Sequence, residues 1–450
     1  MSGNTRPHTE DGRPATYREV FATGEVRALF GSFTISKASS MLARIAVTFL
    51  VFEATESPLL SAAAFGISYA PYLGPAQLLA TVADRLPYRT TMVVADLIRM
   101  VLIGLVAVPG MPLPVMLALV FTSAMVEPAY DASRSALLPK LVTGETLTLA
   151  LSVYLTLNQS AQLVGYLLGG VIAAVDPRIA LLIDSATFGV SAIVLMIFIK
   201  RRPAQSDASK RKNIFKETGE GFVLVFRHRV LRTIALVVFT SITFAIIPEG
   251  VAASWAPEAG GGPILQGTIM ASAPLAAIVS SVVFTRFVKP GIRKKLIRPL
   301  VLIGPLALLP ALFGPPGPVV VAIAVTCNLT VASIAPLNGI FVSAVPDGYR
   351  ARAFSVMQSG TALIQGAAVI SVGVLAQTSL SVSQSVGLWG IAGVLVVVFL
   401  LLTWPSNQEF DDAVATDTTA TASAPGESDA ADDQQAVRDE PAEHSARTAG

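Results

Sequence analysis

The chain has 450 residues, of which 53% are hydrophobic and only 14% are charged, and its formal net charge is +2. Soluble domains carry roughly 25% charged residues, so this composition excludes an ordinary soluble protein and indicates an integral membrane protein. The single cysteine, Cys327, excludes an intramolecular disulfide and a thiolate metal site. His8, His228 and His444 all fall outside the apolar segments, which excludes a histidine proton relay within the membrane.

Apolar segments long enough to cross a bilayer recur along the chain and predict transmembrane helices, because backbone groups in hydrocarbon must be satisfied within the segment. The short alternating segments of a β-barrel are not seen. The predicted fold class is an all-α integral membrane protein with twelve transmembrane helices in two six-helix pseudo-repeats. The spans are expected near residues 27–52, 59–82, 92–108, 113–133, 148–174, 179–199, 230–250, 263–287, 297–313, 317–343, 352–376 and 384–404.

Polar stretches divide the chain into five predicted parts. These are an N-terminal tail at 1–25, a six-helix bundle at 26–200, a linker with an amphipathic helix at 201–229, a second bundle at 230–404, and an acidic tail at 405–450 that cannot bury a core. Lysine and arginine gather on alternate connections, so the positive-inside rule predicts a cytoplasmic-membrane protein with both termini in the cytoplasm.

A charged turn separates the second and third spans. It contains Asp84, Arg85 and Arg89, and a short run with Asp96 and Arg99 follows. A carboxylate and arginines at such a turn can hold one helical bundle against another and release it, which is what the gate of a transporter requires. The alternative is that these residues only end a helix and obey the positive-inside rule.

With this turn between the second and third of twelve spans, residues 25–404 resemble a transporter of the major facilitator superfamily. The loop of that family reads Gly, three residues, Asp, Arg, any residue, Gly, then basic residues. Asp84 and the two arginines of the turn match it, whereas Ala80 and Pro87 replace the glycines and Tyr88 replaces a basic residue.

The resemblance implies a docking site for Asp84 near the start of the eleventh helix, expected around residues 350–354. A carboxylate at a helix N-terminus gains about 0.3–1 kcal/mol. Such a latch is strong enough to bias the outward-open state and weak enough to break.

Three glycines of the fifth span, Gly165, Gly169 and Gly170, resemble the glycine motif of exporters in the same family, although Tyr166 stands where the family has proline. Glycines four residues apart let helix backbones approach closely, and a generic packing face of small residues would have the same pattern. Segments at 35–58, 135–139 and 183–188 also look like the branch of bacterial drug, macrolide and siderophore exporters. This resemblance implies proton-driven efflux of a small, partly apolar molecule.

Ionisable residues within the spans form a candidate proton and substrate cavity, because each costs roughly 2.5–3.5 kcal/mol to insert. Lys37 and Arg44 are seven residues apart and share one helix face, which we expect to border a wet cavity or an acid. Arg44 and Asp184 lie at similar predicted depths and are expected to pair. Glu127 is the leading candidate for a proton-titrating group, because partial burial disfavours an ionised acid.

Alternatives remain for several of these polar residues. Glu127 could instead pair with Arg134 or Lys140 near the surface, and Glu249 is a weaker candidate that we expect at the membrane interface. Amide side chains recur on the fifth and eleventh spans, and they could bind substrate or bond to neighbouring helices. They are Asn158, Gln159 and Gln162 on the former and Gln358 and Gln365 on the latter.

The sequence thus predicts a secondary active transporter that exports a small lipophilic or amphipathic compound by proton-coupled antiport. It has no phosphate-binding loop ending in Lys-Ser/Thr, so ATP is not the expected driver, and we expect no enzymatic activity, metal or cofactor. Its expected partners are the substrate and the lipid bilayer, not nucleic acid, and it is expected to act as a monomer. Alternatives are an importer or uniporter of the same fold, or a transporter-like membrane sensor.

Overall fold

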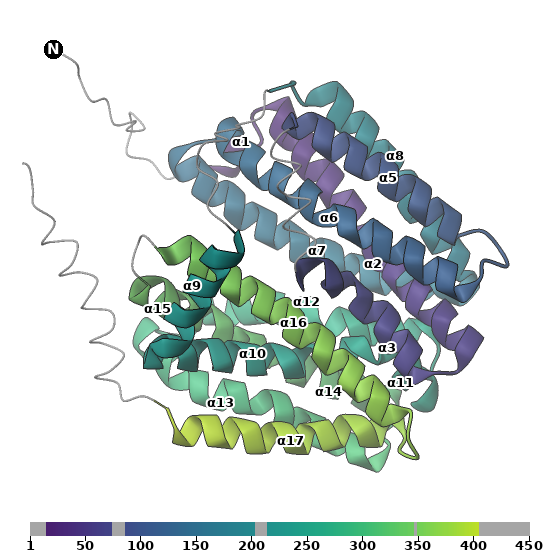
Figure 1. Ribbon diagram of the computed structural model, residues 1–450, viewed down its shortest axis with the longest axis vertical. Helices are drawn as coiled ribbons and strands as arrows, with labels where there is room; N and C mark the ends of the chain where they lie inside the picture. Colours follow the sequence, from purple (N-terminus) through teal and green to yellow (C-terminus); the bar gives the residue numbers. More distant parts are fainter. Residues whose placement is uncertain (1–14, 74–85, 203–213, 346–348, 405–450) are drawn as a thin grey trace, which may run out of the picture.

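The computed structural model describes residues 15–73, 86–202, 214–345 and 349–404, and throughout these residues the regular secondary structure is helical (Figure 1). The first half of the chain forms one bundle. Its elements are α1 (Tyr17–Val20), α2 (Gly24–Thr55), α3 (Pro58–Gly66), the 3₁₀ helix η1 (Ile67–Leu73), α5 (Tyr88–Val106), α6 (Leu113–Leu141), α7 (Gly144–Val175) and α8 (Pro177–Phe198).

The second half of the chain forms another bundle, preceded by the linker helix α9 (Ile214–Arg227). Its elements are α10 (Arg229–Gly250), α11 (Ala252–Glu258), α12 (Pro263–Arg286), α13 (Pro290–Leu308), η3 (Leu309–Phe313), α14 (Gly317–Asn328), η4 (Leu329–Ser333), α15 (Ile334–Ala344), α16 (Arg350–Ala376) and α17 (Val382–Leu402). The observed helix bounds follow the predicted spans closely, and α9 coincides with the predicted amphipathic segment.

Some predicted spans are broken. The segment predicted as a helix at 59–82 is α-helical only to Gly66 and continues as 3₁₀ helix η1, which contains Pro71. Proline lacks the N–H that an α-helix interior needs, which explains a change of helix type here. The predicted gate residues Asp84 and Arg85 lie outside the described residues. The span at 317–343 is likewise divided by η4, where Ser333 Oγ donates to the Thr330 carbonyl, 2.7 Å away.

Within the described residues, nine helical segments are long and apolar enough to cross a membrane; the count of twelve stays a prediction. Large apolar side chains cover the outside of the bundles. On α17, for example, Leu395 is 68% exposed and Leu402 is 81% exposed. A soluble monomer would not leave such an apolar surface in water, whereas lipid tails would cover it.

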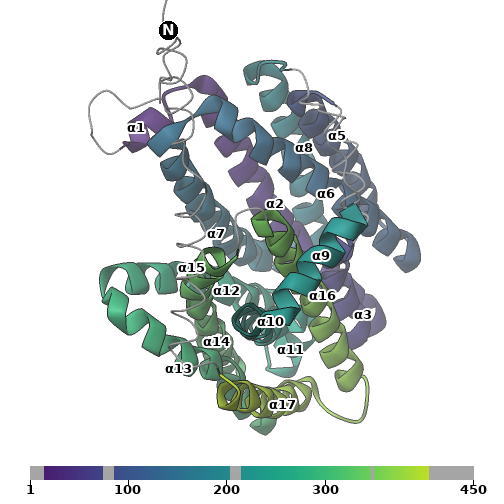
Figure 2. The same cartoon turned by 60° about the vertical axis from the view of Figure 1, so that its left-hand side comes forward.

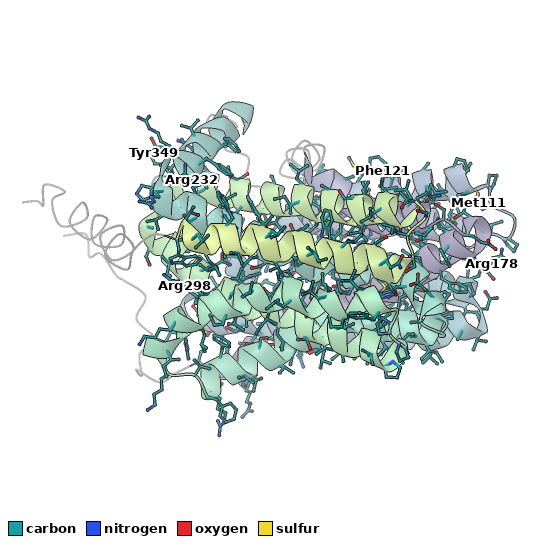
Figure 3. The ribbon with its side chains drawn as sticks, turned by 90° about the horizontal axis from the view of Figure 1, so that it is seen from below. Met111, Phe121, Arg178, Arg232, Arg298 and Tyr349 are labelled. Atoms are coloured by element: carbon teal, nitrogen blue, oxygen red, sulfur yellow. The ribbon has the colours of Figure 1, made fainter. Side chains whose placement is uncertain are left out.

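The helices run nearly parallel between two ends of the molecule. Figure 3 places Arg232, Arg298 and Tyr349 at one end and Met111 and Arg178 at the other. The linker helix α9 lies at the first of these ends (Figure 1). We call the end with Arg232, Arg298 and Tyr349 the linker end. We call the end with Met111 and Arg178 the joined end, because the two bundles meet there.

The bundles meet through α7 against α12, and through α3 and η1 against α16, as the two ribbon views agree (Figures 1 and 2). Gly170 of α7 is essential to this approach. A Cβ on Gly170 would lie 2.7 Å from the Pro263 carbonyl oxygen and 3.2 Å from the Cα of Gly267 on α12. Only residues without a side chain let two backbones come so close.

Hydrogen bonds between the bundles, as far as the described residues show, gather toward the joined end. Gln266 Nε2 donates to Thr48 Oγ1 over 2.8 Å, and Ser57 Oγ donates to Gln377 Oε1 over 2.8 Å. The short helix α11 also belongs to this end, and its Glu258 accepts bonds from the first backbone N–H groups of α17. The result is a two-bundle molecule sealed by specific polar contacts at one end.

Candidate functional site

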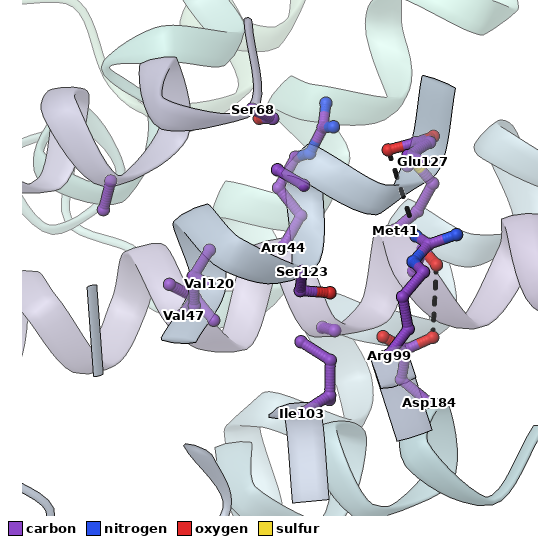
Figure 4. Close-up of a pocket in the computed structure, with 14 residues that line it drawn as sticks. Met41, Arg44, Val47, Ser68, Arg99, Ile103, Val120, Ser123, Glu127 and Asp184 are labelled. Atoms are coloured by element: carbon purple, nitrogen blue, oxygen red, sulfur yellow. Dashed lines mark hydrogen bonds and ion pairs between the residues drawn. The ribbon is translucent and has the colours of Figure 1, made fainter. Parts of the chain in front are cut away.

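A polar cavity of about 80 Å³ lies within the first bundle, among helices α2, α3, α5, α6 and α8 and the helix η1 (Figure 4). Its walls combine apolar side chains with charged and hydroxyl groups. The charged and hydroxyl residues that line it are Ser40, Arg44, Ser68, Arg99, Ser123, Glu127 and Asp184. Polar groups from five separate elements therefore converge on one small space.

Glu127, on α6, is the central acid of this cavity. Its carboxylate lies 3.5 Å from Lys37 Nζ and 3.9 Å from an Arg99 guanidinium nitrogen. The alternative partners Arg134 and Lys140 are engaged elsewhere: Arg134 binds Asp131 at 3.2 Å, while the ammonium of Lys140 lies over the Tyr88 ring. Glu127 thus joins three helices of the bundle by charge, because its two cations come from α2 and α5.

Lys37 and Arg44 lie on the same face of α2, and this face borders both Glu127 and the cavity. The guanidinium of Arg44 lies 5.3 Å from the centre of the Phe65 ring. It also lies beside Tyr69 and Tyr166. Arg44 therefore stands where the cavity meets the boundary between the bundles.

The predicted pair of Arg44 with Asp184 is wrong in this structure. Asp184 Oδ1 accepts hydrogen bonds from Ser39 Oγ at 2.7 Å and from Ser40 Oγ at 3.2 Å. It is therefore level with residues about one turn closer to the N-terminus of α2 than Arg44. Counting residues inward from the connecting loops misplaced it, because α2 extends further toward the joined end than α8 does.

Two of the five predicted gate residues lie inside the bundle and not at a loop. Because α5 begins at Tyr88, Asp96 and Arg99 are two and three turns into the helix. Asp96 is buried and accepts a 2.6 Å hydrogen bond from Ser191 of α8, while Arg99 reaches Glu127 and stacks on the Phe188 ring. Arg89 is half-buried in the first turn of α5.

The three glycines of α7 lie at contacts with two different helices. Gly165 and Gly169 pack on α2, where added Cβ atoms would collide with the Ala38 carbonyl oxygen and approach the Leu42 Cα. Gly170 instead faces α12 of the other bundle. The same short motif therefore holds α7 within its bundle and presses it against the second one.

The predicted amide side chains do not line the cavity within the described residues. Asn158 and Gln162 both donate to Gln159 Oε1 at 3.2 Å, so they bond to one another along α7. Gln365 is half-buried on α16, the helix that packs on η1.

Glu249 is buried at the boundary between the bundles, which corrects the expected interfacial position. It accepts a 3.2 Å hydrogen bond from the Tyr166 hydroxyl, and only 8% of its surface is exposed. Gln266 and Gln377 were not singled out from the sequence, and neither were the cavity hydroxyls of Ser68 and Ser123. Nothing in their local patterns marks them, because Gln266 and Gln377 bond to remote helices and the two serines line a cavity that several helices build together.

Histidine, cysteine, aspartate and glutamate side chains do not gather in groups of three or more that could hold a metal ion, within the part of the chain that the structure describes. The arrangement instead consists of two helical bundles, sealed at one end, with a charged cavity beside their boundary. This is the architecture of a membrane transporter that works by moving one bundle against the other.

The family follows from comparison with known sequences. A family model for the Major Facilitator Superfamily matches residues 28–368, so the chain belongs to this superfamily of transporters. No curated protein sequence matches the chain significantly.

Solved structures with the same fold include several transporters of low sequence identity. A POT family transporter in complex with a thioalcohol-conjugated peptide is 13% identical, with a TM-score of 0.65 over 83% of this chain and 95% of its own. The nucleoside transporter NupG, as a point mutant, is 12% identical, with a TM-score of 0.66 over 85% of this chain and 100% of its own. A structure described under proton dependent oligopeptide transporters is 14% identical, with a TM-score of 0.62 over 86% of this chain and 99% of its own.

Proposed function

We propose that this protein exports a small amphipathic compound across the cytoplasmic membrane by alternating access, in exchange for protons. The observation that carries the proposal is the charged cavity beside a boundary that is sealed by hydrogen bonds at the joined end. Two bundles of this kind can rock about a site between them. The site would then open to one side of the membrane at a time.

The distribution of basic residues supports an orientation for this cycle. Arg232 and Arg298 lie at the linker end, together with the basic segment at 200–202 that follows α8. The positive-inside rule then puts the linker end, and both termini, in the cytoplasm. In this orientation the joined end faces outward, and the conformation is closed toward the outside.

Glu127 is the proposed proton-exchanging group. Protonation of its carboxylate would remove its attraction for Lys37 and Arg99, which come from two different helices. A single proton would thereby loosen α2 and α5 around the cavity. The likeness in fold to transporters described as proton dependent supports this coupling.

The experiment is the retention of fluorescent lipophilic and amphipathic dyes in a bacterium that lacks its own efflux pumps. Cells would express the intact protein, Glu127→Gln, Asp84→Asn, or the control Glu53→Gln, which changes an exposed acid on α2 outside the cavity. We expect cells with the intact protein or the control to retain less dye than cells without the protein. A protonophore, or the substitution Glu127→Gln, should restore dye retention to the level of cells without the protein. Export that persists in Glu127→Gln at normal expression contradicts the proposed proton site.

A second candidate function is uptake or equilibration of a polar small molecule. It is favoured by the small, charged cavity and by the likeness in fold to peptide and nucleoside transporters. The same assay separates the two functions, because an importer raises the dye content of the cells above that of cells without the protein. A membrane sensor would neither lower nor raise the dye content of the cells. Deleting residues 408–450 would silence a sensor that signals through its tail, and would leave a transporter active.

A further inference from the structure

Arg44 is a membrane-embedded cation without an ion pair. Within the described residues, no carboxylate lies within 4.0 Å of its guanidinium. Its neighbours are the Phe65 ring and the side chains of Tyr69 and Tyr166, which are neutral. A charge in a membrane protein is costly unless an opposite charge or water balances it, so Arg44 requires a reason to be there.

The two nearest acids have other partners. Glu127 is shared between Lys37 and Arg99, and Glu249, in the other bundle, is held by the Tyr166 hydroxyl. Asp184 is occupied by the hydroxyls of α2. Glu127 and Glu249 act on Arg44 only at longer range, because neither carboxylate lies within 4.0 Å of its guanidinium. Among the three cations Lys37, Arg44 and Arg99 around the cavity, Arg44 is therefore the one that makes no ion pair within the described residues.

The cavity has the size of a charged group and not of a whole substrate. It measures about 80 Å³. A water molecule in the liquid takes about 30 Å³, and pockets that hold drug-sized molecules measure roughly 300–1,000 Å³. A carboxylate or a phosphate would fill this space, while the remainder of a larger molecule would have to extend beyond it.

The lining also suits such a group. Guanidinium presents a planar fork of N–H donors that matches the two oxygens of a carboxylate or phosphate. Ser68 and Ser123 line the same cavity, and the Arg44 side chain lies between them in Figure 4. The Ser68 hydroxyl donates to the Phe65 carbonyl, 2.7 Å away, so Ser123 is the hydroxyl that can add a donor. The Phe65 ring beside Arg44 offers an apolar surface to an adjoining carbon skeleton.

We propose that the transported compound carries an acidic group, a carboxylate or a phosphate, and that Arg44 binds this group in the cavity of the first bundle. The inference rests on the proposed transport function and narrows its substrate class from amphipathic compounds in general to organic anions. It also explains the position of Arg44 beside Tyr166, because an anion bound there would lie next to the contact that closes the joined end.

The test is thermal unfolding of the purified full-length protein in detergent, with matched acids and neutral compounds as probes. The pairs are benzoate and methyl benzoate, and phenyl phosphate and phenol. A ligand that binds only the folded protein raises its melting temperature. We expect at least one acid to raise it and its neutral partner to have no effect. Equal effects within every pair, or no effect of any acid, would overturn the inference.

Variants then assign the binding to Arg44. We expect Arg44→Gln to weaken binding of the active acid by about 10- to 100-fold, since it removes hydrogen bonds to a charged group, and Arg44→Lys to weaken it less. Arg201→Gln, which changes an exposed arginine after α8, is the control and should bind as the intact protein does. Normal binding by a folded Arg44→Gln would overturn the assignment. If Arg44→Gln does not fold, the acid and ester pairs decide on the intact protein alone.

The dye retention experiment keeps this inference separate from the proposed function. Export of neutral and cationic dyes, with no acid bound, would leave the transport function standing and overturn the organic-anion class. Binding of acids without export of any dye would support the site at Arg44 and contradict proton-driven export.

Discussion

The Tyr166 hydroxyl on α7 donates a 3.2 Å hydrogen bond to the Glu249 carboxylate on α10, and this bond crosses the boundary between the two bundles. Both side chains are buried. Because the bond exists only while the bundles meet at the joined end, it stabilises this conformation over one in which that end is open. Loss of this bond should therefore shift the protein toward the conformation in which the joined end is open.

Tyr166→Phe is expected to open the joined end more often. It removes one hydrogen bond, which is worth about 0.5–1.5 kcal/mol, from the closed conformation alone. The reporter is the rate at which a membrane-impermeant maleimide modifies Ala62→Cys in a Cys327→Ala background. Ala62 is fully buried here and lies against Gly373 of α16, so it becomes reactive only when the bundles separate.

The matched control for this prediction is Tyr130→Phe, which removes a buried tyrosine hydroxyl within the first bundle. We expect modification of Ala62→Cys to be several-fold faster in Tyr166→Phe and unchanged in Tyr130→Phe. Equal rates in the two variants would show that the bond to Glu249 does not hold the joined end.

Gly170→Ala is expected to destabilise the protein by forcing α7 away from α12. The added Cβ would lie 2.7 Å from the Pro263 carbonyl oxygen, and overpacking of this kind costs about 1–3 kcal/mol. Gly31→Ala on α2 is the comparison, because its Cβ meets no atom within 4 Å and alanine is the better helix former. Thermal unfolding in detergent should rank Gly31→Ala at or above the intact protein and Gly170→Ala below it; the reverse order would refute the close approach.

The helices could be predicted from the sequence because the bilayer requires long apolar segments, and this requirement is local. The face shared by Lys37 and Arg44 follows in the same way from helical periodicity. Partners could not be predicted. The contact between Asp184 and Ser39 depends on how far α2 and α8 are offset along their axes. The contact between Gly170 and Gly267 depends on how the two bundles pack against each other. Such quantities arise from tertiary packing, and no pattern within one span encodes them.

Lys37 and Glu127 are expected to behave as a coupled pair in stability. Removing Glu127 leaves Lys37 without this carboxylate, and removing Lys37 leaves Glu127 with only the more distant Arg99. The stability lost in the double variant should therefore be smaller than the sum of the losses in the two single variants. We expect a coupling free energy above about 0.5 kcal/mol between Lys37→Gln and Glu127→Gln in unfolding measurements. Glu53→Gln changes an exposed acid on the same helix as Lys37, and it should show no coupling free energy with Lys37→Gln. Additive losses would mean that the 3.5 Å contact contributes nothing.

Asp184 provides the sharpest comparison, because the sequence and the structure assign it different partners. Its carboxylate accepts a 2.7 Å hydrogen bond from Ser39 Oγ, and its distance from Arg44 exceeds that of an ion pair. Asp184→Asn and Ser39→Ala should therefore be coupled in stability by more than about 0.5 kcal/mol, since Asp184→Asn removes the charge that strengthens this buried bond and Ser39→Ala removes its donor.

Asp184→Asn and Arg44→Gln should instead be additive to within about 0.3–0.5 kcal/mol, as is usual for sites that share no partner. All single and double variants would be unfolded under identical detergent conditions, and the two cycles share the Asp184→Asn protein, so an error in that variant cancels from their comparison. Strong coupling to Arg44 with none to Ser39 would restore the ion pair that the sequence suggests. It would also supply Arg44 with a carboxylate partner, and would thereby remove the reason for an anion to bind there.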